Sequence, residues 1–60
     1  MNKYTIVVYD AAGPHTESVQ SDSFFVDEGG HLLFSVTEDG DDFDIVSIFR
    51  AGHWAQVSKT

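Results

Sequence analysis

Residues 44–57 read DIVSIFRAGHWAQV, and this stretch decides the fold that the sequence predicts. Side chains alternate between the two faces of a strand, so Ile45 and Phe49 should point one way and Val46 and Ile48 the other. Large apolar residues on both faces are typical of a strand that is covered on both sides. We therefore expect residues 45–49 to be the central strand of a small all-β core.

Beyond Arg50 the sequence predicts a tight corner. Ala51, Gly52 and His53 form a turn signal, and a single helical turn could sit at residues 51–54. Residues 54–59 then resume an extended pattern that begins with Trp54, the only tryptophan of the chain. His53 beside this ring is a candidate for a group that titrates near an interface.

Working outward from this stretch, period-two alternation predicts further strands separated by turns rich in Gly and Asp. Residues 24–26 and 31–37 should pair as an antiparallel hairpin around the turn Asp27-Glu28-Gly29-Gly30. The polar residues 15–23 could add an exposed edge strand. The expected strands are residues 3–10, 24–26, 31–37, 45–49 and 54–59.

The fold class that follows is all-β, because no stretch repeats apolar residues at helical spacing. We expect residues 1–60 to form one domain, a five-stranded antiparallel meander curled into a small SH3-like or Sm-like barrel. The alternative is an open sheet whose second face is covered by another copy of the chain.

Length and composition favour self-association. A chain of 60 residues buries only ~60% of its unfolded surface, and this one has no cysteine with which to form a disulfide. Oligomerisation is the remaining common way to enlarge so small a core, and we expect a homo-oligomer. The lack of cysteine also suits a reducing compartment, and no signal peptide or membrane span is predicted, so we expect a cytoplasmic protein.

The net charge is −7, from ten acidic residues against Lys3, Arg50 and Lys59. This charge repels phosphate groups, so binding to nucleic acid or to an anionic membrane is disfavoured. A protein partner with a basic surface is the better expectation.

Half of the acidic residues cluster in one turn, where Glu38, Asp39, Asp41, Asp42 and Asp44 place five carboxylates within seven residues. The run lacks the spacing of an EF-hand, so we expect a solvated turn, with a contact patch for a basic partner or a weak cation site as the alternatives, and we assign no metal ligands. His15, His31 and His53 are too widely spaced to form a zinc motif.

Catalysis is the least supported class. None of the serines lies in a nucleophile elbow, and every acid lies in or beside a predicted turn, so no pair of carboxylates in a cleft is indicated. We expect neither enzymatic activity nor a cofactor.

The aromatic residues exceed what one face of a small core can hide. Phe24 and Phe25 are adjacent, so they should point to opposite faces of any regular strand, and one should be exposed or covered by another chain. A barrel bend that brings both inside is the alternative. The residues that we predict to bind a partner are Tyr9, Phe25, Asp39, Asp41, Asp42, His53 and Trp54.

Three segments carry a resemblance to known proteins: VVYD at residues 7–10, FFVDEGGHLLF at 24–34 and IVSIFRAGHWAQV at 45–57. Their order resembles short acidic β-proteins encoded by actinobacteria and their phages, a resemblance that implies no catalytic residue. Val8-Tyr9-Asp10 and Gly52-His53-Trp54 are also similar to two signatures of SH3 domains, which implies a small barrel.

The function that we predict is therefore non-enzymatic protein binding, with self-association. The alternative is an acidic inhibitor of the phage type that mimics nucleic acid and occupies a basic site on a host protein. Such mimicry requires acids spaced along one face, whereas this chain gathers them in turns.

Overall fold

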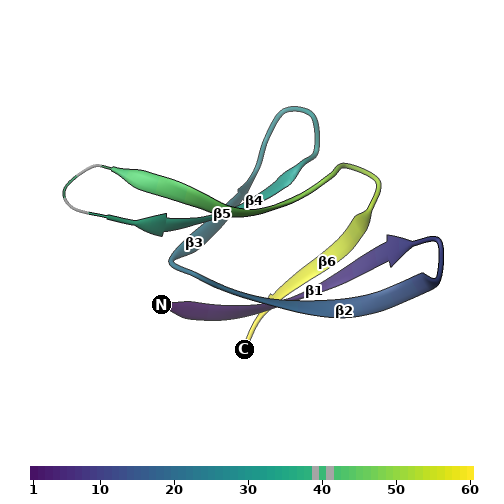
Figure 1. Ribbon diagram of the computed structural model, residues 1–60. Helices are drawn as coiled ribbons and strands as arrows, with labels where there is room; N and C mark the ends of the chain where they lie inside the picture. Colours follow the sequence, from purple (N-terminus) through teal and green to yellow (C-terminus); the bar gives the residue numbers. More distant parts are fainter. Residues whose placement is uncertain (39, 41) are drawn as a thin grey trace.

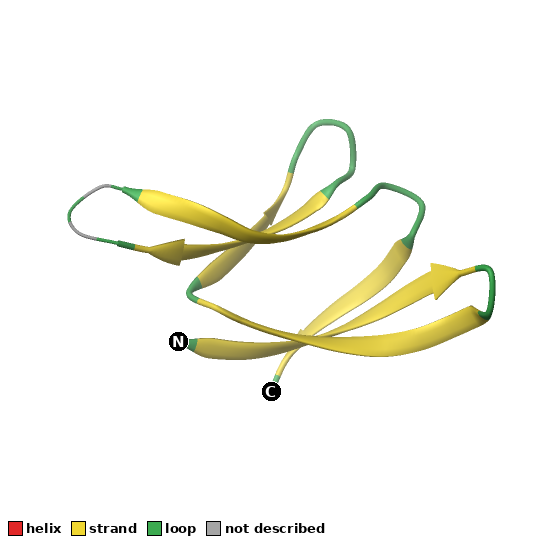
Figure 2. Ribbon diagram, in the orientation of Figure 1, coloured by secondary structure: helices red, strands yellow, loops and turns green. Residues whose placement is uncertain are grey.

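The chain folds into two three-stranded antiparallel sheets (Figure 1). The computed structural model describes residues 1–38, 40 and 42–60, and within them only strands and loops occur (Figure 2). The first sheet has the order β2-β1-β6 and the second the order β3-β4-β5. The strands are β1 (Asn2–Asp10), β2 (Gly13–Ser21), β3 (Ser23–Val26), β4 (Leu32–Thr37), β5 (Phe43–Phe49) and β6 (Trp54–Lys59).

The chain passes from one sheet to the other with a single residue between strands. Ser21 pairs with Asn2 in the first sheet, and Ser23 pairs with Ser35 in the second, so the direction changes at Asp22. The backbone N–H of Asp22 donates to the carbonyl of Ser35 at 2.9 Å, and the Ser21 hydroxyl donates to the carbonyl of Ser23 at 3.0 Å. These bonds fix how the second sheet begins.

The core lies between the sheets and is built from the middle strand of each. Tyr4, Ile6 and Val8 of β1 are buried, as are Leu32 and Phe34 of β4. The ring of Phe34 lies 5.5 Å from that of Tyr4 and 5.8 Å from that of Phe49, between centroids. A middle strand is flanked on both edges, which explains why β1 and β4 supply the most buried residues.

Hydrogen bonds tie the turn before β4 to the start of β6. The Trp54 indole Nε1–H donates to the carbonyl of Gly30 at 3.0 Å, and the N–H of Ala51 donates to His31 Nδ1 at 2.9 Å. Gly30 has a φ of 85°, and a side chain added there would meet the Ala51 Cβ at 3.3 Å. The turn thus needs glycine both for its backbone and for its close approach to the last loop.

The predicted hairpin of residues 24–26 and 31–37 is confirmed by the antiparallel pairing of β3 with β4. Its turn is held by Asp27, whose Oδ1 accepts the N–H groups of Gly29 and His31, both at 2.9 Å. The polar strand expected over residues 15–23 is also present, as the edge strand β2.

The predicted five-stranded meander barrel is wrong. The last strand, β6, pairs with β1 in the first sheet, while β5 pairs only with β4 in the second, so the two sheets stay separate. The helical turn expected at residues 51–54 is also wrong. Residues 51–53 form a turn in which His53 N–H donates to the carbonyl of Arg50 at 3.0 Å, and Trp54 already begins β6.

The central position predicted for residues 45–49 is wrong as well. β5 is an edge strand, and Ile45, Val46 and Ile48 are 38%, 46% and 59% exposed. The apolar pattern on both faces predicted cover on both sides, but the first sheet covers only one face of β5. The described residues contain no further element that covers the other face.

Candidate functional site

The second sheet packs one face on the core and turns the other away from the first sheet; we call the latter the outer face. Residues directly opposite each other in an antiparallel pair point to the same face. Since Phe34 lies in the core opposite Phe24, the neighbouring pair Phe25 and Leu33 points outward. Following the register across the sheet gives the residues of the outer face: Ser23, Phe25, Leu33, Ser35, Thr37, Phe43, Ile45 and Ile48.

A bulge in β5 decides which apolar residues reach the outer face. Phe34 lies opposite Ser47, whereas the next residue, Ser35, lies opposite Ile45, so Val46 is an extra residue in the strand. An extra residue changes the phase of the alternation. Ile45 and Ile48, three positions apart, therefore share the outer face, although a regular strand would place them on opposite faces.

The large side chains of the outer face are accessible to solvent. Phe43 is 58% exposed and Phe25 is 43% exposed. Phe25 lies on the edge strand β3, and Phe43, Ile45 and Ile48 lie along the opposite edge strand β5, so both edges of the outer face are apolar. A contiguous apolar patch on a small protein typically marks a place where another molecule binds.

The solvent-facing side of the first sheet has the opposite chemistry. Its register places mainly polar residues there: Lys3, Thr5, Val7 and Tyr9 of β1, Pro14, Thr16, Ser18 and Gln20 of β2, and Gln56 and Ser58 of β6. The two sheets have the same number of strands and each covers the core with one face. An apolar solvent-facing side is therefore specific to the second sheet, since the first sheet has a similar position in the fold but a mainly polar one.

A pocket of about 380 Å³ lies at the hairpin end of the outer face. Two phenylalanine side chains, Phe25 of β3 and Phe43 of β5, line it, together with three hydroxyl side chains from β3 and β4. The Ser23 and Ser35 hydroxyl oxygens are 3.0 Å apart and share a hydrogen bond. The lining residues are Ser23, Phe25, Ser35, Thr37, Gly40, Asp42 and Phe43.

The loop between β4 and β5 makes this end of the sheet acidic. The pKa of Glu38 is raised above its ordinary value because its carboxyl shares a hydrogen bond with Asp44, and because the two negative charges repel each other. Asp44 lies opposite Val36, whereas Phe43 lies opposite Thr37 on the outer face. The side chain of Asp44, and the Glu38 carboxyl bonded to it, therefore lie on the other face of the β4–β5 hairpin. The predicted partner residues Asp39 and Asp41 lie outside the described residues.

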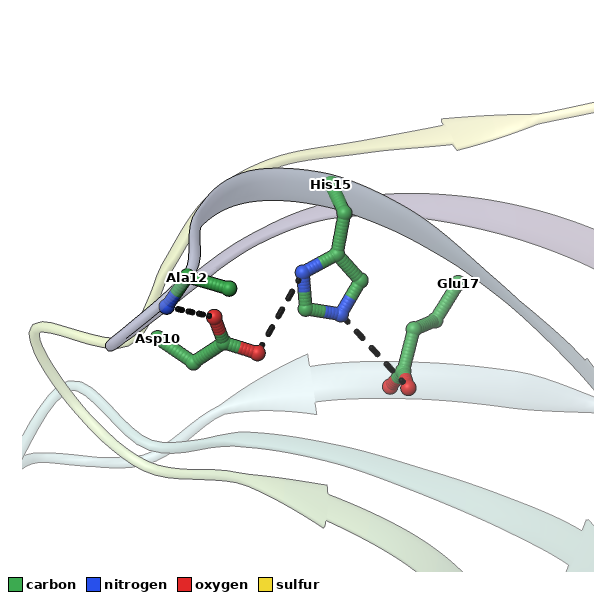
Figure 3. A network of polar contacts seen from close by, with 4 residues as sticks. All are labelled: Asp10, Ala12, His15 and Glu17. Atoms are coloured by element: carbon green, nitrogen blue, oxygen red, sulfur yellow. Dashed lines mark hydrogen bonds and ion pairs between the residues drawn. The ribbon is translucent and has the colours of Figure 1, made fainter.

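A second polar cluster lies at the far end of the first sheet (Figure 3). His15 Nδ1 is 3.4 Å from an oxygen of Asp10, and His15 Nε2 is 3.9 Å from an oxygen of Glu17. The other Asp10 oxygen accepts the N–H of Ala12 at 2.8 Å, which closes the turn between β1 and β2. In the described part of the chain no group of three or more His, Asp or Glu side chains could hold a metal ion. This cluster is best explained as a brace of the β1–β2 hairpin.

The structure divides the predicted partner-binding residues among three places. Phe25 and Asp42 both line the pocket. Tyr9 and His53 adjoin each other at the first sheet, where the Tyr9 N–H donates to the His53 carbonyl at 2.8 Å. Trp54 is half-buried and packs against the core, so its ring belongs to the interior.

The sequence reasoning missed most of the outer face, namely Ser23, Leu33, Ser35, Thr37, Gly40, Phe43, Ile45 and Ile48. One signal did point to it: Phe24 and Phe25 were predicted to face opposite ways, and this is confirmed. The Phe24 ring packs inward, with its centroid 5.2 Å from that of Tyr4, while Phe25 faces outward. The bulge at Val46 left no recognisable signal in the sequence.

Comparison of the chain with models of protein families, with curated proteins and with solved structures finds no match. Across residues 1–38, 40 and 42–60, the structure contains no helix with the length and apolar character needed to cross a membrane.

Proposed function

We propose that the chain is a non-enzymatic β domain that binds other proteins, and also a second copy of itself, through the outer face of its second sheet. The observation that carries the proposal is the contrast between the two solvent-facing sheet faces, of which only one is apolar. The absence of cysteine is the reason for expecting it to act in the cytoplasm.

The area of the outer face supports weak and reversible binding. Three strands about 4.8 Å apart, with seven residues of ~3.4 Å each along β5, give a flat footprint of roughly 300 Å². Stable interfaces bury about 800 Å² on each partner. The face alone is therefore better matched to a short segment of a partner, or to self-association at high concentration, than to a permanent dimer.

The charge of the chain predicts opposite salt dependence for its two proposed binding partners, a second copy of the chain and a basic protein. Each chain carries −7, so two copies repel each other, while a basic partner is attracted. Salt screens both effects over about 8–10 Å. Self-association should therefore strengthen as salt is added, and binding of a basic protein should weaken.

The acids of the described residues do not favour the alternative of nucleic-acid mimicry. Asp10 and Glu17 lie on the first sheet, Asp22 lies at the crossing between sheets, and the remaining described acids lie near the two ends of β4. Mimicry needs acids spaced along one face, and we do not propose it.

The test is sedimentation velocity over a hundredfold range of protein concentration, at low and at high salt. The unsubstituted chain should show concentration-dependent association that increases with salt. The double substitution of Ile45→Thr and Ile48→Thr should weaken the association by tenfold or more, because it removes two exposed apolar side chains from the outer face.

The matched control is Val7→Thr, the same kind of change on the polar face of the first sheet. It should leave association unchanged. A strict monomer at every concentration would remove self-association from the proposal, and equal weakening by the control would show that the outer face is not the binding surface.

A further inference from the structure

We infer that the pocket at the hairpin end of the outer face receives a cationic side chain, an arginine guanidinium carried by an extended segment of a basic protein. The inference rests on the proposed function and names what part of the partner the face recognises. It depends on the walls of the pocket, on its hydroxyl groups and on the charge around it.

The aromatic walls suit a flat cation. Phe25 and Phe43 come from the two edge strands and both line the pocket, with Phe43 58% exposed. The face of an aromatic ring attracts a cation within about 6 Å of its centroid, and arginine is found there more often than lysine. A guanidinium is also planar and weakly hydrated, so it stacks on a ring at a lower desolvation cost than an ammonium group.

The hydroxyl groups supply acceptors that a guanidinium can use. Ser23 and Ser35 share one hydrogen bond, which uses one hydrogen and one lone pair of the two hydroxyls. The pair therefore keeps three lone pairs to accept hydrogen bonds, and Thr37 adds two more. A guanidinium presents five N–H donors and no acceptor, so it complements a pocket lined by oxygen atoms.

Charge selects the cation over a neutral apolar side chain. Asp42 lines the pocket, and Glu38 and Asp44 lie on the other face of the same hairpin, close enough to each other to repel. A carboxylate that accepts a hydrogen bond from a guanidinium forms one of the stronger contacts in proteins. The net charge of −7 attracts a basic segment before contact is made.

The size of the pocket fits a side chain, with the chain of the partner running across the rest of the face. Its volume of about 380 Å³ is at the small end of the range of ligand sites, ~300–1,000 Å³. From there the row of Ile45 and Ile48 continues along β5, and it can contact apolar residues next to the arginine.

The test is calorimetric titration with three blocked heptapeptides that share threonine and valine flanks and differ at the central residue. The central residue is arginine, its neutral analogue citrulline, or lysine. The arginine peptide should bind about tenfold more tightly than the citrulline peptide, because citrulline has nearly the same shape but carries no charge and has a carbonyl in place of one NH2 donor group; lysine should be intermediate. Equal binding of the arginine and citrulline peptides would contradict the inference. This test uses the unsubstituted protein, so misfolding of a variant cannot account for the result.

Two protein variants locate the site. Asp42→Asn removes a charge at the pocket and should weaken the arginine peptide several-fold, with little effect on the citrulline peptide. Glu28→Gln removes the same charge from the turn at the other end of β4 and should leave both affinities unchanged. Equal effects of the two variants would mean that the peptide responds only to the overall charge of the protein, and would contradict the assignment of the arginine site to this pocket.

The outcomes distinguish this inference from the proposed function. If sedimentation shows association through the outer face while the peptides do not discriminate charge, the function stands and the pocket assignment is wrong. If the arginine peptide binds in a manner sensitive to Asp42→Asn but the isoleucine substitutions change no association, the pocket stands and self-association through the face is wrong.

Discussion

The two sheets of this protein each turn one face to solvent, and the chemistry of those faces is opposite. On the first sheet the exposed positions are mostly Thr, Ser, Gln and Lys, as expected where water is the only neighbour. On the second sheet the equivalent positions include Phe25, Phe43, Ile45 and Ile48. Because the two sheets are alike in strand number and in how they cover the core, folding alone does not require the apolar outer face, and this difference is the basis of the proposed binding surface.

The largest expected effect contrasts the buried and exposed faces of the second sheet. Phe34→Ala removes a fully buried ring that contacts Tyr4, Phe24 and Phe49, and should destabilise the fold by about 3–5 kcal/mol. A domain of this size has little more stability than that, so the variant should be largely unfolded. Phe43→Ala on the outer face should change the free energy of unfolding by less than about 1 kcal/mol.

Urea denaturation followed by tryptophan fluorescence measures both, since Trp54 packs against the core. Similar losses for the two variants would mean that the outer face contributes to folding, and the comparison between faces would fail.

A finer contrast uses two adjacent residues of the same type and similar exposure. Phe24 is 39% exposed and Phe25 is 43% exposed, but Phe24 packs edge-on against Tyr4 while Phe25 lines the pocket. Phe24→Ala should destabilise the fold by about 1–2 kcal/mol and leave peptide binding intact. Phe25→Ala should do the reverse, which the same urea and calorimetric measurements can show.

The comparison can also be tested by transferring the apolar character to the first sheet. Thr16 and Ser18 lie opposite Val7 and Thr5 on its solvent-facing side, so Thr16→Ile with Ser18→Ile would create a second apolar patch. We expect the variant to fold with stability changed by about 0.5 kcal/mol or less, and to self-associate at roughly tenfold lower concentration. Sedimentation velocity measures the change, and unaltered association would show that exposed apolar residues alone do not make a binding face in this fold.

The smallest expected effect concerns Glu38, whose pKa is raised by Asp44. A raised carboxyl pKa means that this group favours the folded state while protonated. That contribution is present below the ordinary value of 4.5 and is lost as the pH rises through the raised pKa. At neutral pH the charged pair repels, so Glu38→Gln should raise the melting temperature slightly, and the gain should disappear in acid.

Thermal melts of both proteins across pH measure this difference. The matched control is Glu28→Gln, which removes the same charge at the opposite end of β4. A gain of the same size and pH dependence in the control would assign the effect to net charge and not to the pair.

Much of the strand content could be predicted from the sequence. The alternation Tyr4, Ile6 and Val8 identifies the buried face of β1, and the turn at Asp27–Gly30 identifies the β3–β4 hairpin because its residues satisfy the backbone locally. Both features depend on residues close together in the sequence, so the alternation of apolar residues and the turn residues are enough to predict them.

The arrangement of the strands could not be predicted in the same way. The apolar residues of β5 look alike whether a sheet, a partner or water covers them, so the pattern did not reveal that this strand lies at an edge. The crossing at Asp22 depends on bonds to Ser35, a residue distant in sequence. Of the candidate site, Phe25 and Asp42 were predicted. Ile45 and Ile48 were missed because residues 45–49 were expected to be covered on both sides, and the bulge at Val46, which places the two on one face, was not foreseen.

That extra residue means that the surface of this protein is encoded in the length of β5 as well as in its composition. A regular ladder with Val46 paired in the strand would turn Phe43 and Ile45 toward the interior and bring Asp44 out among the pocket residues, with the same sequence. Deleting Val46 would instead remove the bulge and leave Ile45 opposite Ser35 and Phe43 opposite Thr37, as they are now. An insertion between Asp44 and Ile45, by contrast, would place Asp44 opposite Thr37 and turn Phe43 inward. On the proposed function, such a one-residue insertion should weaken binding, while deletion of Val46 should preserve it.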